Sequence, residues 1–136
     1  MRRLAVAILL LVPVAVWVIT QPSTLSADDL PDHEGDAAAG ERMFWAGGCA
    51  SCHATPVDGR RAKGADKLVL GGGMALESPY GTFHVPNISP HADGIGGWTT
   101  LVFVNAMMRG VSPDGRHYYP SFPYACLLYT SDAADE

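Results

Sequence analysis

The feature that most constrains this chain is a run of five residues, Cys49-Ala50-Ser51-Cys52-His53. Two thiols three positions apart on a short helical turn can each reach one vinyl group of a porphyrin. The residue after the second thiol then places an imidazole under the iron. The run therefore predicts covalent attachment of haem c, with thioethers at Cys49 and Cys52 and with His53 as the proximal iron ligand.

Three other uses of the same five residues compete with haem attachment. A structural zinc site needs four ligands, and the chain has no second pair of cysteines. A thioredoxin-like redox pair belongs in a βαβ setting, which the sequence does not predict. A plain disulfide between Cys49 and Cys52 suits an oxidising compartment and would make the chain a non-redox structural module. The histidine directly after the second cysteine favours haem.

The amino terminus has the parts of an export signal. Met1-Arg2-Arg3 precedes an uncharged run over residues 4–19 that is interrupted only by Pro13. Sixteen helical residues span about 24 Å, a little short of the hydrocarbon core of about 30 Å, and residues 21–27 offer no clean cleavage site. Residues 1–22 are therefore predicted to be either a signal peptide or a membrane anchor. The two arginines should stay in the cytoplasm, which puts the following residues on the periplasmic side.

Two helices are predicted in the exported part. Asp36 is placed as the N-cap of a helix over residues 37–45, which ends just before the cysteine motif. Thr99 is placed as the cap of a second helix over residues 100–109, and Gly110 closes it.

The other segments are predicted to be loops and turns. Residues 23–35 are polar and contain Pro31, which is typical of a linker. Residues 55–90 carry several Gly and Pro breakers, and residues 94–97 and 112–115 have the composition of turns. Fifteen Gly and ten Pro in 136 residues indicate a small, loop-rich body. The net charge of -5 argues against a nucleic-acid partner.

A longer pattern surrounds the cysteine motif and extends over residues 37–124. Its pieces are Gly40-Glu41, Phe44, Gly81-Thr82-Phe83, Asn87-Ile88-Ser89-Pro90, Gly94-Ile95-Gly96-Gly97-Trp98-Thr99, Phe103, Arg109-Gly110, Asp114-Gly115 and Tyr118-Tyr119-Pro120-Ser121-Phe122-Pro123-Tyr124. This pattern resembles the cytochrome c class I family, in the branch related to the cytochrome subunits of membrane-bound dehydrogenases. The resemblance implies a mostly α, small cytochrome c fold around a covalent haem. It also implies that Trp98 leans on the haem and that the Asn87 segment borders its edge. Roles as ordinary core or turn residues stay open for both.

The pattern breaks off near the carboxy terminus. The family ends in a helix, and nothing after Ala125 matches it. All of residues 126–136 fit the translation of a nucleotide sequence that resembles the adapter used in transposase-based sequencing libraries. We therefore expect an incomplete cytochrome c domain over residues 36–125, without the C-terminal helix, followed by a sequencing artefact that includes Cys126.

The second axial ligand of the iron is not evident. Electron-transfer cytochromes usually have a Met thioether in this position, and Phe122 stands where some relatives carry that Met. Met74, in a Gly-rich loop, is a weak candidate, whereas Met107 and Met108 fit core positions on the second helix. Solvated or hydrogen-bonded roles are expected for three further histidines, His84, His91 and His117. We expect the distal ligand to be missing from this chain.

These expectations favour an electron carrier over an enzyme, with no catalytic residue of its own. The resemblance implies a place in a membrane-associated respiratory chain, where the carrier can be a subunit of a dehydrogenase complex. The donor would be a membrane-bound dehydrogenase or a quinol-oxidising complex, and the acceptor another cytochrome or a terminal oxidase. A haem enzyme or gas sensor with an open sixth position is the main rival hypothesis.

Overall fold

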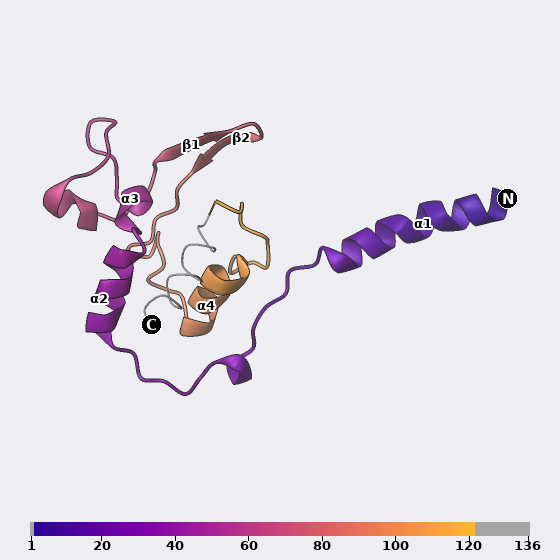
Figure 1. The fold of residues 1–136 in the computed structure, drawn as a ribbon, viewed down its shortest axis with the longest axis horizontal. Helices are drawn as coiled ribbons and strands as arrows, with labels where there is room; N and C mark the ends of the chain where they lie inside the picture. The colour runs from indigo at the N-terminus through magenta and orange to yellow at the C-terminus, as the bar shows by residue number, and fades with distance from the viewer. Residues whose placement is uncertain (1, 122–136) are drawn as a thin grey trace, which may run out of the picture.

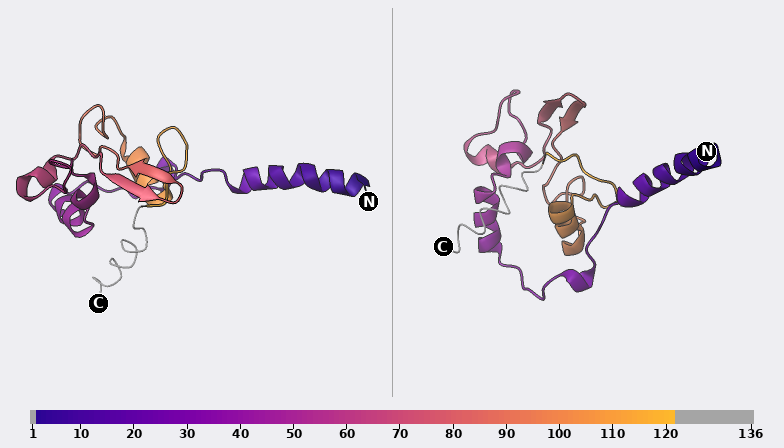
Figure 2. Two further views of the ribbon diagram at one scale, coloured as in Figure 1. Left: turned by 90° about the horizontal axis from the view of Figure 1, so that it is seen from above. Right: turned by 45° about the vertical axis from the view of Figure 1, so that its right-hand side comes forward.

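The computed structural model describes residues 2–121, and it describes side chains from residue 8 onward. Its elements, in which η denotes a 3-10 helix, are α1 (Arg2–Ile19), η1 (Ala27–Asp29), α2 (Ala37–Ala46), α3 (Ala50–His53), η2 (Gly64–Leu68), β1 (Ala75–Ser78), β2 (Gly81–His84) and α4 (Thr100–Arg109). Figure 1 shows α1 extending away from the other elements, and both views in Figure 2 agree. The predictions on Phe122, Cys126, the C-terminal helix and the adapter-like tail lie outside the described residues.

The amino-terminal helix α1 continues through Pro13 as one element. Its described side chains, those of residues 8–19, are all exposed. In the part of the chain that the structure describes, no helix has both the length and the apolar content needed to cross a membrane. The assignment of residues 1–22 as a signal peptide or an anchor stays a prediction.

Both helices predicted on either side of the motif are present, and local hydrogen bonds explain where they begin. The Asp36 carboxylate accepts from two backbone N–H groups in the first turn of α2, at 2.8 and 3.1 Å. The Thr99 hydroxyl oxygen accepts from the N–H of Val102 at 3.3 Å, at the start of α4. Gly110 ends α4 in the left-handed conformation, with φ of 62°. Each of these residues has the role that the sequence predicted.

The segment 55–90, which was predicted to be loop-like, contains a β-hairpin as well as η2. Strand β1 pairs antiparallel with β2, and Ser78 stands opposite Gly81. The Ser78 hydroxyl donates to the Gly81 carbonyl at 2.9 Å and accepts from the Tyr80 N–H at 3.1 Å. The Ser78-Pro79 pair, expected to break regular structure, therefore closes a hairpin turn. The described fold is mixed rather than mostly α, and it is small and loop-rich as predicted.

The predicted linker over residues 23–35 has structure of its own. The backbone N–H and the hydroxyl of Ser26 donate to the Asp29 carboxylate at 2.7 and 2.8 Å, and these bonds hold the pKa of Asp29 below its ordinary value. One residue earlier, the Leu25 N–H donates to Asn105 Oδ1 at 2.7 Å, and Asn105 Nδ2 donates to the Leu25 carbonyl at 3.1 Å. Two hydrogen bonds thus fasten this segment to α4.

The buried apolar side chains of the described residues lie in α3 and in the segments that follow α3, β2 and α4. They are Ala50, Ala54, Ala62, Val85 and Val111. Each is an alanine or a valine, so the core is built of small side chains. Two of the five, Ala50 and Ala54, belong to the turn that carries the cysteine motif or directly follow it.

Candidate haem site

The cysteine motif lies on the short helix α3, which follows α2 after a turn. The His53 N–H donates to the Cys49 carbonyl at 3.0 Å, and the Cys49 N–H donates to the Phe44 carbonyl at 3.3 Å. These bonds place the motif on a helical turn, as the spacing predicted. The thiols of Cys49 and Cys52 are both free and half-buried. Burial raises the pKa of the Cys49 thiol, which keeps it in the neutral S–H form at neutral pH.

The imidazole of His53 is oriented by a backbone partner. Its Nδ1 lies 2.9 Å from the carbonyl oxygen of Pro86. Because a carbonyl oxygen only accepts, Nδ1 carries the proton in this contact, and Nε2 keeps a free lone pair. That tautomer is the one that can bind a metal through Nε2. Two free thiols and an imidazole of this kind fit the requirements of haem c.

A Gly-rich loop holds the Pro86 segment beside α3. The Gly72 N–H donates to the His53 carbonyl at 2.9 Å, and the Gly73 N–H donates to the Val85 carbonyl at 2.8 Å. Gly72 has a φ of +69°, and a Cβ at this position would collide with the carbonyl oxygens of Val85 and Pro86. Only glycine fits here. Sequence reasoning identified neither Gly72 nor Pro86 as part of the site.

The two other residues predicted to border the haem, Asn87 and Trp98, lie at the two ends of one turn. Asn87 Oδ1 accepts from the Ser89 N–H at 2.8 Å, and the Ser89 carbonyl accepts from the Ile95 N–H at 3.0 Å. Trp98 follows this turn, is half-buried and donates its N–H to the Ile95 carbonyl at 3.0 Å. Asn87 therefore has the turn role that the sequence left open. Contact of either residue with haem stays a prediction.

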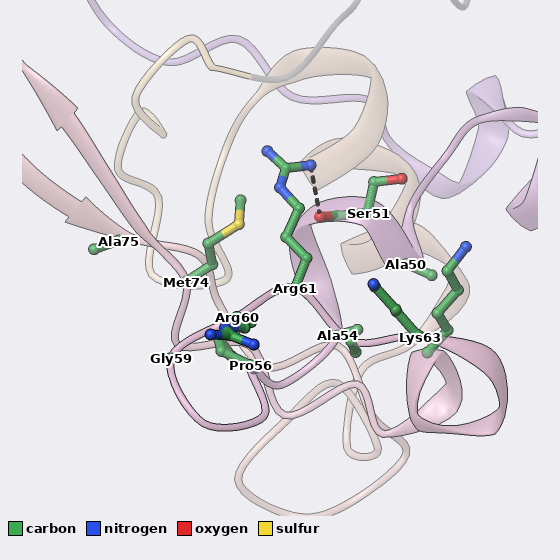
Figure 3. Close-up of a pocket in the computed structure, with 12 residues that line it drawn as sticks. Ala50, Ser51, Ala54, Pro56, Gly59, Arg60, Arg61, Lys63, Met74 and Ala75 are labelled. Carbon is green, nitrogen blue, oxygen red and sulfur yellow. Dashed lines mark hydrogen bonds between the residues drawn. The ribbon is translucent and has the colours of Figure 1, made fainter.

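The methionines differ in their placement. Met74 is half-buried and lines a cavity of about 520 Å³ beside α3. Figure 3 shows Met74 on one side of this cavity and Arg61 reaching along α3, where its Nη1 donates to the Ser51 carbonyl at 3.4 Å. A role for Met74 as distal ligand stays a prediction. Met107 is half-buried, but Met108 is 59% exposed, which contradicts the core position expected for it.

Three histidines have the solvated or hydrogen-bonded environments that were expected. His84 is exposed on β2. The Nδ1 atom of His91 lies 3.3 Å from the Asp93 carboxylate. The Nε2 atom of His117 lies 3.0 Å from the Thr20 carbonyl, just after α1.

Comparison with known proteins places these features in a family. No family model matches the chain. The "Diheme cytochrome c-type" of Cereibacter sphaeroides is 47% identical over 142 aligned positions, covering 99% of this chain and 46% of that protein. The fructose dehydrogenase cytochrome subunit of Gluconobacter japonicus is 34% identical over 106 positions, covering 77% of this chain and 19% of that protein. The gluconate 2-dehydrogenase cytochrome c subunit of Pantoea cypripedii is 33% identical over 113 positions, covering 80% of this chain and 24% of that protein.

The chain spans less than half the length of each of these relatives. By name they are a cytochrome c and two cytochrome subunits of dehydrogenases, which agrees with the family that the sequence pattern resembles. The cofactor that defines c-type cytochromes is covalently attached haem c, an iron porphyrin. The chain therefore belongs to the c-type cytochromes and is related to the cytochrome subunits of dehydrogenases.

Proposed function

We propose that the chain carries single electrons through haem c attached at Cys49 and Cys52, with His53 as the proximal iron ligand. The observation that carries the proposal is the 2.9 Å contact between His53 Nδ1 and the Pro86 carbonyl, next to two free thiols. A protein needs such a contact to present Nε2 to a metal in a fixed orientation. When bound, the haem supplies a ferric–ferrous couple, so no bond in a substrate is made or broken.

The residues around the motif have separate tasks in this proposal. Cys49 and Cys52 provide the two thioethers, and their half-buried positions on one helical turn fix the edge of the ring that they hold. His53 provides the iron ligand, and the Pro86 carbonyl keeps its ring from rotating. Trp98, also half-buried, is assigned to the wall that excludes water from the cofactor. The chain itself provides attachment, ligation and a dry environment rather than catalysis.

We assign the partners from the relatives. Those named as dehydrogenase cytochrome subunits support a dehydrogenase as the electron donor. A membrane-bound dehydrogenase or a quinol-oxidising complex is the proposed donor, and another cytochrome or a terminal oxidase is the proposed acceptor, in a membrane-associated respiratory chain. The basic start of the chain and the exposed apolar helix that follows it support export to the periplasmic side, as a cleaved or anchored protein.

The proposal is tested by producing the full chain in a host that can attach haem c. Mass spectrometry should show the mature polypeptide with the added mass of one haem. The pyridine haemochrome spectrum should be that of a haem whose two vinyl groups have both been converted to thioethers. Dithionite and ferricyanide should reduce and reoxidise it reversibly. The variants Cys49→Ala and Cys52→Ala should each lose one thioether, whereas Cys126→Ala should keep both. A polypeptide that gains no haem mass in that host would end the proposal.

A further inference from the structure

Positive charge is concentrated in one loop of an otherwise acidic chain. Of the nine Lys and Arg residues, four lie within eight positions, and the chain as a whole carries a net charge of -5. These four, Arg60, Arg61, Lys63 and Lys67, are called the basic loop below. All four are exposed, and the one carboxylate among them is that of Asp66. The loop therefore has a positive field of its own within a negative molecule.

The basic loop packs against the turn that carries the haem motif. It lines the cavity of about 520 Å³ together with Ala50, Ser51 and Ala54 of α3 and the residue after it. Ala50 and Ser51 are the two residues between the predicted haem cysteines. Arg61 donates to the Ser51 carbonyl at 3.4 Å, and Figure 3 shows Lys63 on the opposite side of the turn from Met74. A group bound by the loop would thus lie next to the haem attachment site.

The position of the basic loop distinguishes between an anionic membrane and an anionic protein. Figure 1 and both views of Figure 2 show the segment around η2 at the end of the molecule far from α1. The segment that follows α1 is held on the other side, because His117 contacts the Thr20 carbonyl and Asn105 binds Leu25. If α1 lies at a membrane, the basic loop faces away from it. This arrangement favours a protein partner over lipid headgroups.

Exposed apolar side chains border the basic loop. Val57, Leu68 and Val69 are 46%, 61% and 56% exposed. Protein interfaces combine apolar contacts with a charged rim, whereas a small anion has no use for apolar neighbours. The mixture favours a macromolecular partner over a free phosphate or carboxylate.

We propose that the basic loop is the docking surface for an acidic face of a protein that exchanges electrons with this chain. The proposal rests on the electron-carrier function proposed above and adds the place and the charge of the contact. Complementary charge raises the rate at which two redox proteins meet and orients them on contact. Docking at α3 would bring the partner close to the thioether side of the haem.

The test compares three haem-bearing forms of the full chain. They are the wild type, the loop variant Arg60→Gln/Lys63→Gln, and the control variant Arg42→Gln/Arg109→Gln, which removes the same charge from exposed positions on α2 and α4. The probe is poly-L-glutamate at low ionic strength. The loop variant should bind it about five-fold more weakly than the wild type, and the control within about two-fold, with both differences lost in high salt. Bound poly-L-glutamate should slow oxidation of the reduced wild type by ferricyanide.

Each other outcome overturns the docking surface. Equal weakening in both variants would make the effect one of net charge alone. Poly-L-glutamate that binds without slowing the oxidation would lie away from the haem. If the loop variant bound inorganic phosphate about five-fold more weakly than the wild type, the loop would be a small-anion site. A similar weakening of its binding to phosphatidylglycerol vesicles would indicate a lipid surface. Failure of haem attachment, measured separately as the haemochrome, would overturn the electron-carrier function itself. Attached haem with equal affinities in all three proteins would overturn only the docking surface.

Discussion

At the scale of single residues, the site depends on how His53 is held. Its ring contacts the Pro86 carbonyl, and its own carbonyl accepts from the Gly72 N–H, each at 2.9 Å. Gly72 lies before the β-hairpin and Pro86 lies after it, so both ends of the hairpin meet at α3. The orientation of the proposed proximal ligand therefore depends on a close approach of backbone to backbone, which a side chain at Gly72 would prevent.

The variant Gly72→Ala should destabilise the haem-bearing protein more than Gly73→Ala. Both glycines have positive φ, +69° and +92°, but only at Gly72 would the new Cβ collide with neighbouring carbonyl oxygens. We expect the free energy of unfolding to fall by about 1 kcal/mol for Gly73→Ala and by about 3 kcal/mol for Gly72→Ala. Urea unfolding followed by Soret absorption measures both. Equal losses would show that the loop is not packed on the Pro86 segment.

At the scale of elements, the features that were predicted correctly from the sequence are those that depend on residues close together in the chain. Asp36 and Thr99 cap helices with their own side chains, and Gly110 adopts the conformation that ends α4. These roles depend on residues within one helical turn, so they can be predicted locally. The hairpin was not predicted because its strands have only four residues each with little alternation of apolar and polar side chains, and because proline usually interrupts regular structure, as Pro79 would here.

Contacts between elements could not be predicted from the sequence. Pro86 binds His53 through a carbonyl, a group that every residue has, from 33 positions away. Asn105 binds Leu25 across 80 positions, and in the sequence it resembles any polar residue of a helix. The topology selects such partners, and no local pattern marks them. The cysteine motif consists of five adjacent residues and could therefore be predicted. The Pro86 carbonyl that orients its histidine lies far away in the sequence and could not.

The variant Asn105→Ala should release the segment after α1 from α4. Asn105 is 8% exposed and makes two hydrogen bonds with Leu25, at 2.7 and 3.1 Å. Their loss leaves partly buried backbone groups without partners, which should lower the free energy of unfolding by about 1–3 kcal/mol. Hydrogen exchange at the Leu25 amide should become markedly faster. Met108→Ala, at an exposed position of the same helix, is the control and should change neither the free energy of unfolding nor the exchange rate of the Leu25 amide. Unchanged protection of Leu25 in Asn105→Ala would mean that the segment is held by other contacts.

At the scale of the whole molecule, the described residues bury little apolar surface. Every apolar side chain in their core is an alanine or a valine, while Met43, Trp45 and Phe103 are 62%, 44% and 42% exposed. A domain of this size needs a further source of apolar contact or a covalent constraint. Haem c attached at the proposed cysteines would provide both, because it is a large apolar ring that would be bonded to α3. In the proposed function, the cofactor would then be part of the core as well as the carrier of the electron.

The haem-free double variant Cys49→Ala/Cys52→Ala should therefore lose cooperative tertiary structure. We expect its urea transition to be broad, with an m-value about half that of the haem-bearing protein, because little surface is buried in a common core. Near-UV circular dichroism should be weak, while helical far-UV signal persists in part from α1, which has no share in that core. The variant Cys126→Ala, with both thioethers kept, should unfold as sharply as the wild type. A haem-free form with the wild-type midpoint and slope would mean that the polypeptide completes its core alone, and haem would then be bound to a finished fold instead of completing it.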